Sequence, residues 1–194
     1  MKVYREVKMK VEHFELCDSI DVKLKGIGKF TATAYKVYED GSALFIFDEC
    51  ITDRPMNNKS TNEGGFNQSD LRKWMNTELL RAFPVKIRTR MMDVRVNDDE
   101  DAMLLRVPTR MEMFGTDEYT DDYEAENNER LAFMDIRSNR VCMSPADEYC
   151  WYWLWNRRVV SAPYFAYVTA TGLATYAGAS NSRGVRPAFR INYL

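Results

Sequence analysis

Three tryptophans, Trp151, Trp153 and Trp155, alternate with Tyr152 and Leu154. Successive side chains of an extended strand point to opposite faces of a sheet, so the three indole rings would share one face. Rings of this size are costly to leave in water, and we expect at least the first two to be buried. The last quarter of the chain therefore has to fold as part of a β-sheet with an apolar core.

Further strand-like segments follow. Residues 164–171 and 174–177 flank Gly172 and are expected to form a hairpin. In 185–191 the alternate apolar residues share a face, which predicts a strand. Pro187 has no backbone N–H to donate to a neighbouring strand, so it indicates an edge or an irregularity at that point.

The first half of the chain also carries strand signals. Residues 30–38 and 43–47 are rich in apolar and aromatic residues and flank Asp40-Gly41, a dipeptide typical of tight turns between paired strands. The apolar run Met103–Val107 predicts another strand. Strands are thus expected on both sides of the middle of the chain.

Two helices are predicted between these strands. After Ser69, a favourable N-cap, apolar residues recur at helical spacing as far as Phe83, and Pro84 ends the helix. Thr109 and Glu112 have the spacing of a capping box, which predicts a second, short helix.

This order of elements predicts an α+β fold. A hydrophobic content of 45% in 194 residues is enough for a packed core. We treat 1–194 as a single domain, in which residues 1–29 form a possible N-terminal strand extension.

The last quarter is also unusual in composition. From Asn156 onward it contains no Glu, Lys, Gln, Met or Trp, although these five types supply 37 of the first 150 residues. They are the types that cannot be encoded when the adenines of an Asn codon are replaced freely and its last base is kept. Strand-rich segments are also depleted in Glu and Lys for ordinary conformational reasons.

Four short motifs in this region carry a resemblance: Trp-Tyr-Trp-Leu at 151–154, Val-Val-Ser at 159–161, Phe-Ala-x-Val at 165–168 and Gly-Val-Arg-Pro-Ala-Phe at 184–189. Over residues 30–191 the chain resembles the variable proteins of diversity-generating retroelements, of phage or gut-bacterial type. The resemblance implies a C-type-lectin-like fold, with two helices packed with antiparallel sheets and with the terminal strands paired.

The same resemblance implies a function. Adenine-directed mutagenesis in those systems diversifies codons near the C-terminus, here the region 151–191. The protein would then display a hypervariable surface to an unidentified protein or glycan target, in host or surface recognition. The candidate ligand-binding residues are Trp155, Asn156, Arg157, Arg158, Tyr164, Tyr167, Thr169, Thr171, Leu173, Thr175, Tyr176, Asn181 and Arg183.

A position that tolerates many residue types cannot support a close-packed core. Apart from Trp155 and Leu173, all the candidate residues are therefore expected to gather on one solvent-exposed face. The residues expected to be buried beneath that face are Trp151, Trp153, Leu154, Phe165, Val168, Val185 and Phe189.

Groups suited to catalysis or metal binding are sparse. The cysteines, Cys17, Cys50, Cys142 and Cys150, are widely spaced and His13 is the single histidine, so a zinc site would need all four thiolates together. Reduced and mostly buried thiols are the expected state.

The acidic run 98–101 lacks the glycine placement and ligand spacing of a calcium loop. We expect no catalytic residue, metal or cofactor. The alternative is a lectin-fold oxidase related to formylglycine-generating enzymes, which would use Cys142 and Cys150, or a metal-dependent enzyme using the acidic run.

Charge and hydropathy restrict the partners. The net charge of −2 gives no reason to expect nucleic acid. No apolar run approaches the roughly 18 residues of a membrane span, so we expect no membrane insertion. The N-terminus has no pattern of a secretory signal, which favours a cytoplasmic protein or one assembled into a phage particle. The oligomeric state stays open.

Overall fold

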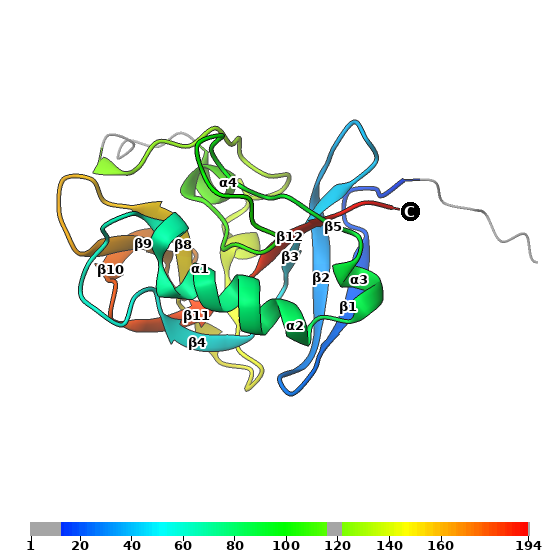
Figure 1. The fold of residues 1–194 in the computed structure, drawn as a ribbon, viewed down its shortest axis with the longest axis horizontal. Helices are drawn as coiled ribbons and strands as arrows, with labels where there is room; N and C mark the ends of the chain where they lie inside the picture. The colour runs from blue at the N-terminus through cyan, green and yellow to red at the C-terminus, as the bar shows by residue number, and fades with distance from the viewer. Residues whose placement is uncertain (1–12, 116–121, 194) are drawn as a thin grey trace, which may run out of the picture.

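Two five-stranded sheets form the framework of the protein in this computed structural model, which describes residues 13–115 and 122–193 (Figure 1). Strands and short helices share the chain, so the predicted α+β class is confirmed. Within the described residues, no helix is both long and apolar enough to cross a membrane.

The first sheet is built mainly from the N-terminal part of the chain. Its strand order is β1 (Ser19–Leu24), β2 (Gly28–Val37), β3 (Ala43–Phe47), β12 (Ala188–Ile191) and β5 (Met91–Met92), with antiparallel neighbours throughout. The predicted hairpin is confirmed by β2 and β3, and Gly41 in its turn has a φ of 78° that suits glycine. All five residues of β3 are buried.

The second sheet contains most of the C-terminal quarter. Its order is β10 (Ala174–Gly178), β9 (Tyr164–Val168), β8 (Tyr152–Arg157), β11 (Ser182–Val185) and β4 (Thr52–Pro55). The β9–β10 hairpin confirms the prediction around Gly172, whose φ is 77°. A separate two-stranded ribbon joins β6 (Cys142–Met143) to β7 (Tyr149–Cys150).

The last segment of the chain crosses between the two sheets. The strand predicted over 185–191 is divided into β11 and β12, and Pro187 lies at the break, as its missing donor indicated. Arg186 is buried at the crossing, where its Nε donates to the carbonyl of Phe47 (2.7 Å) and its Nη1 to the hydroxyl of Tyr152 (3.1 Å). One guanidinium group therefore links the two sheets.

The first predicted helix is confirmed. The Ser69 hydroxyl accepts a hydrogen bond from the Arg72 N–H (3.0 Å), and α1 (Asp70–Trp74), a π-helical turn (Met75–Leu79) and α2 (Leu80–Ala82) run on without a break. Leu71, Met75 and Leu79 are buried, so one side of the helix packs onto the sheets (Figure 1). A one-turn helix that was not predicted, α3 (Val85–Arg88), follows Pro84.

The second predicted helix is also present as α4 (Arg110–Phe114), with both hydrogen bonds of the Thr109–Glu112 capping box. Glu112 is buried and pairs with the buried guanidinium of Arg106, Nη2 to Oε1 at 2.5 Å. Two single-turn 3₁₀ helices, Phe66–Gln68 and Arg137–Arg140, complete the helical elements described.

Two strand predictions need correction. Residues 103–107 form no strand, because only Arg106 makes a bridge, to Ala188, while the alternate apolar side chains are buried in the core. The terminal strands β1 and β12 lie in one sheet, as predicted, but β2 and β3 separate them, so they do not pair. Residues 1–12 of the possible N-terminal extension lie outside the described residues.

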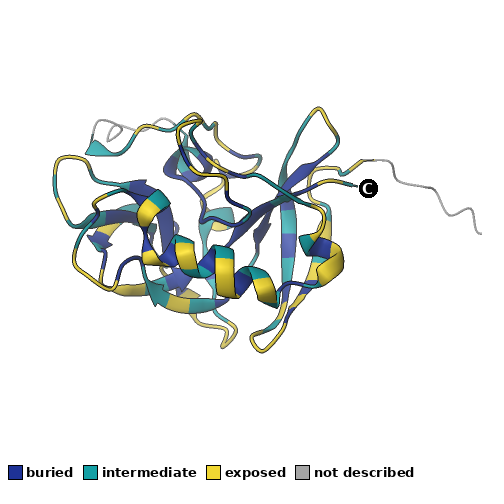
Figure 2. Ribbon diagram, in the orientation of Figure 1, coloured by how far each residue is buried: buried dark blue, intermediate teal, exposed yellow. Residues whose placement is uncertain are grey.

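The core runs through both sheets. In Figure 2 the central strands are mostly dark blue, whereas the outer side of α1 and α2 and the peripheral loops are yellow. Phe189 has no exposed surface, and its ring lies 5.3–5.9 Å from the rings of Phe45, Phe47 and Phe83. This aromatic cluster fills the space beside β3 and β12.

Candidate ligand-binding site

Most residues predicted to form the core of the C-terminal quarter are buried. Six of them have no exposed surface: Trp153, Leu154, Phe165, Val168, Val185 and Phe189. Trp151 is the exception, since 49% of its surface is exposed.

The prediction for Trp151 was wrong: this residue lies just before β8, and its ring is not covered by the rest of the fold. Its ring lies on the surface, 6.3 Å from the ring of Tyr167, and the Arg183 guanidinium lies 5.1 Å from its centre. Trp153 shares the same side of the strand, yet its indole is fully buried and donates to the carbonyl of Arg54 (2.8 Å). Alternation alone does not distinguish these two environments.

Asn156 was expected on the exposed face and is buried instead, with 2% of its surface exposed. Its Oδ1 accepts from the Arg110 N–H (2.7 Å), and its Nδ2 donates to Glu126 Oε1 (2.8 Å). The amide therefore connects the start of α4 with the segment around Glu126. Trp155, also proposed as a ligand contact, is 1% exposed inside the core, so neither residue can present its side chain to a ligand.

The eleven remaining candidates keep at least part of their surface accessible. Four are exposed, namely Thr171, Leu173, Tyr176 and Asn181, and seven are half-buried, namely Arg157, Arg158, Tyr164, Tyr167, Thr169, Thr175 and Arg183.

These candidates do not gather on one face, contrary to the prediction. The regular pairing of β9 with β10 places Tyr164 and Tyr176 on one side of the sheet, with ring centres 5.3 Å apart. Tyr167 lies on the other side, where the Arg183 guanidinium stacks 5.0 Å from its ring centre. The expected surface is therefore divided between the two faces of the sheet.

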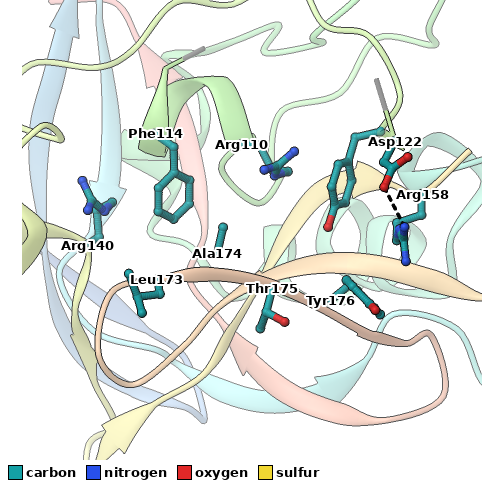
Figure 3. Close-up of a pocket in the computed structure, with 10 residues that line it drawn as sticks. Arg110, Phe114, Asp122, Arg140, Arg158, Leu173, Ala174, Thr175 and Tyr176 are labelled. Atoms are coloured by element: carbon teal, nitrogen blue, oxygen red, sulfur yellow. Dashed lines mark hydrogen bonds and ion pairs between the residues drawn. The ribbon is translucent and has the colours of Figure 1, made fainter. Parts of the chain in front are cut away.

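The face that carries Tyr176 borders a cleft of about 520 Å³. The cleft lies between α4, the end of β8 and the loop and first residues of β10 (Figure 3). Its lining residues are Arg110, Phe114, Asp122, Tyr123, Arg140, Arg158, Leu173, Ala174, Thr175 and Tyr176.

Aromatic rings hold the three arginines of this cleft. The guanidinium of Arg110 lies 3.9 Å from the ring centre of Tyr123, and that of Arg158 lies 4.3 Å from Tyr176. The third, Arg140, lies 4.8 Å from Phe114. Stacking of this kind is attractive and keeps each flat cation in a defined orientation.

Among the described residues that line the cleft, Asp122 is the one carboxylate beside these cations. Asp122 Oδ2 lies 2.7 Å from Arg158 Nη2, and this hydrogen bond raises the pKa of Arg158. The described part of the cleft lining thus carries three guanidinium groups and one carboxylate. Its aromatic and aliphatic walls would accommodate the apolar parts of a ligand that also carries an anionic or strongly polar group.

Four of the predicted site residues line the cleft, namely Arg158, Leu173, Thr175 and Tyr176. Sequence reasoning missed the opposite wall, which includes Arg110 and Phe114 of α4 together with Asp122 and Tyr123. Arg110 and Phe114 are four residues apart on that helix and so face the same direction. The helical period could have predicted that these two residues share one face of the helix. No local sequence signal indicated that α4 packs opposite β10.

Residues 40–193 match the profile of a family described as a domain of unknown function, DUF6273. The chain belongs to the DUF6273 family. No curated protein and no solved structure matches it.

A second cavity of this DUF6273 domain, of about 440 Å³, lies beside Trp151 and Arg183. Cys150 is part of its lining, and the pairing of β6 with β7 places Cys142 directly across from Cys150. The two cysteines of the enzymatic alternative are therefore neighbours. Among the described residues, no group of three or more His, Cys, Asp or Glu side chains is arranged to hold a metal ion.

Proposed function

We propose that this protein is a ligand-binding protein that engages a protein or glycan target through the arginine-lined cleft. The proposal includes the C-type-lectin-like fold and the retroelement-directed variation implied by the sequence resemblance. Binding, and no chemical reaction, is the function assigned to the cleft.

The cleft itself is the observation that carries the proposal. It combines a volume of about 520 Å³ with three stacked guanidinium groups at the edge of a rigid sheet. Arginine binds carboxylates through paired, charge-assisted hydrogen bonds. A carboxylate-bearing target, either an acidic glycan or an acidic segment of a protein surface, is therefore favoured.

The position of the variable residues also supports this function. Leu173 and Tyr176 are 49% and 45% exposed, so other side chains there would change the cleft lining while leaving the core intact. Tyrosine and arginine are frequent energetic anchors of binding surfaces. Asn156 and Trp155 are excluded from this set by their burial.

The test is a binding screen with defined probes. The purified protein is applied to an array of oligosaccharides with and without uronic or sialic acid residues, and to a matched set of acidic and neutral peptides. We expect binding to carboxylate-bearing members of one of these sets. Uniform signals at the level of blank spots would contradict the proposal.

Two matched variants assign the binding to the cleft. Leu173→Glu places a like charge beside the proposed carboxylate site, and Val85→Glu makes the same change on α3, at a residue that is 63% exposed. We expect Leu173→Glu to weaken binding by about tenfold or more and Val85→Glu to leave it unchanged. Equal affinities of both variants would place the ligand elsewhere.

The proposed retroelement-directed variation can be tested in the DNA that surrounds the coding sequence. A reverse transcriptase gene beside the coding sequence, with a near-identical repeat differing at adenines, supports it. Such differences should fall in codons of cleft residues such as Thr175 and Tyr176 and spare those of core residues such as Trp153.

A further inference from the structure

Three thiols converge between the two sheets. Cys50 follows β3, and Cys142 and Cys150 occupy paired positions of the β6–β7 ribbon. The Sγ atoms of Cys50 and Cys142 are 3.3 Å apart, and the thiol of Cys150 lies close enough to shift the pKa of Cys50. All three are free cysteines, so residues separated by up to a hundred positions in the sequence form one thiol cluster.

The backbone holds this cluster in place. The Cys50 N–H donates to the carbonyl of Met143 (2.9 Å), which fixes Cys50 against the β6–β7 ribbon. Gly184 leaves the space that the sulfur needs, since a Cβ atom there would lie 2.6 Å from Cys50 Sγ. The close approach of β11 to the thiol therefore requires glycine at this position.

The pKa values of the three thiols are shifted in opposite directions. The hydrogen bond from Cys50 lowers the pKa of Cys142, and the buried Arg186 lowers it further against the opposing effect of burial. The interaction with Cys50 also lowers the pKa of Cys150, whereas the pKa of Cys50 itself is raised. Thiolate character, which controls cysteine reactivity, is thus favoured at Cys142 and Cys150.

Cys150 and Cys142 differ in how accessible they are to solvent. Cys150 lines the 440 Å³ cavity beside Trp151 and is 8% exposed, whereas Cys50 and Cys142 are each 1% exposed. A small reagent that enters the cavity meets Cys150 first, because neither Cys50 nor Cys142 is part of the cavity lining.

We propose that Cys50, Cys142 and Cys150 form a redox site, in which Cys150 reacts with a hydroperoxide and Cys50 then closes a disulfide with it. The site is independent of the arginine-lined cleft. No additional reductant or cofactor is required for this reaction.

The chemistry balances with hydrogen peroxide as oxidant. The Cys150 thiolate attacks one peroxide oxygen, the O–O bond breaks, and the departing hydroxide takes up a proton to become water, leaving a sulfenic acid on Cys150. The Cys50 sulfur attacks that sulfur, the S–O bond breaks, and water departs with the Cys50 proton. Two thiols lose two electrons in total, and one peroxide becomes two waters. Cys142, 3.3 Å from Cys50, can then exchange into the disulfide.

The experiment uses the reduced full-length protein with a small excess of hydrogen peroxide. After oxidation, the remaining free thiols are alkylated and the peptides are mapped. The map should show a disulfide between Cys50 and either Cys150 or Cys142. Cys17, which is exposed and outside the cluster, should remain a free thiol and therefore be found alkylated. Oxidation of Cys17 before the cluster, or a cluster that stays reduced, would overturn the proposal.

Cysteine variants separate the roles of the thiols. Cys150→Ser should slow disulfide formation on the order of tenfold or more, because the accessible nucleophile is lost. Cys50→Ser combined with Cys142→Ser should leave a sulfenic acid on Cys150 that dimedone traps, because no neighbouring thiol can then displace it. Cys142→Ser alone should still form the Cys50–Cys150 disulfide. Cys17→Ser, the matched control, should react like the unaltered protein.

Unchanged oxidation kinetics in Cys150→Ser would contradict the assigned entry point. Thermal melts of the reduced variants establish that each one folds. Dimedone adds a defined mass to a sulfenic acid. Its attachment to Cys150 in the Cys50→Ser/Cys142→Ser variant would be a direct readout that a merely structural thiol would not produce.

Discussion

The two sheets of this protein differ in how they use their faces. The first has an entirely buried strand, β3, packed beside an aromatic cluster that contains Phe189. The second buries Trp153 and Phe165 but keeps Tyr164, Tyr167 and Tyr176 accessible on two sides. The first sheet serves as scaffold, and both candidate sites border the second.

This difference has a cause in the way each sheet is covered. Rings from Phe47 and Phe83 pack against Phe189 in the first sheet. In the second, the cleft and the cavity beside Cys150 leave parts of the sheet surface open. Residues that border an opening can change without creating a void, whereas core residues cannot.

The largest effect is expected in the scaffold. Phe189→Ala should lower the free energy of unfolding by about 3–5 kcal/mol, because the ring is fully buried among three other rings and its loss leaves a cavity. Urea denaturation measures this loss. A loss below about 1 kcal/mol would remove the distinction between the two sheets.

An intermediate effect is expected where the second sheet buries a polar group. Asn156→Ala should cost about 1–3 kcal/mol, since the Arg110 N–H and the Glu126 carboxylate would lose hydrogen bonds in a buried place. Asn181→Ala, at an exposed residue, is the matched control and should change stability by less than about 0.5 kcal/mol. Equal losses in the two variants would mean that the amide of Asn156 contributes nothing specific.

The burial of Glu126 can be tested through the pH dependence of protein stability. Burial raises the pKa of this carboxyl, and hydrogen bonds from Thr109, the Met111 N–H and Asn156 only partly oppose the shift. The folded protein therefore holds this proton more tightly than the unfolded chain, and stability falls as pH rises from the ordinary glutamate pKa to the raised one.

Glu126→Gln removes that titration while its amide oxygen can still accept from the Met111 N–H. Urea melts are measured at pH values from about 4 to about 8, which cover the titration of this carboxyl. The free energy of unfolding should decline less with rising pH in Glu126→Gln than in the unaltered protein. An identical pH dependence in both proteins would mean that Glu126 is not linked to folding.

The smallest effects are expected at the exposed aromatics of the second sheet. Trp151→Ala and Tyr176→Ala should each cost less than about 1 kcal/mol, because both rings keep nearly half their surface exposed. The same melts measure these variants. Losses as large as that of Phe189→Ala would place these rings in the core and contradict the division of the sheet.

Local patterns were sufficient for the two predicted helix starts and the two hairpins. Ser69 and the Thr109–Glu112 pair marked both helix starts, and Gly41 and Gly172 marked the two hairpins. Each of these signals depends on hydrogen bonds or dihedral angles within a few residues. The sequence could therefore specify them without knowledge of what packs against each element.

Which surfaces are covered was decided by the tertiary structure. Trp151 and Trp153 follow the same alternation, yet only Trp153 is covered, and Asn156 is buried because α4 and the segment around Glu126 meet its amide. The cleft and the thiol cluster depend on the same long-range packing, which brings α4 opposite β10 and Cys50 beside Cys142. Periodicity determines the direction of a side chain, but its burial depends on elements distant in sequence that only the folded chain brings together.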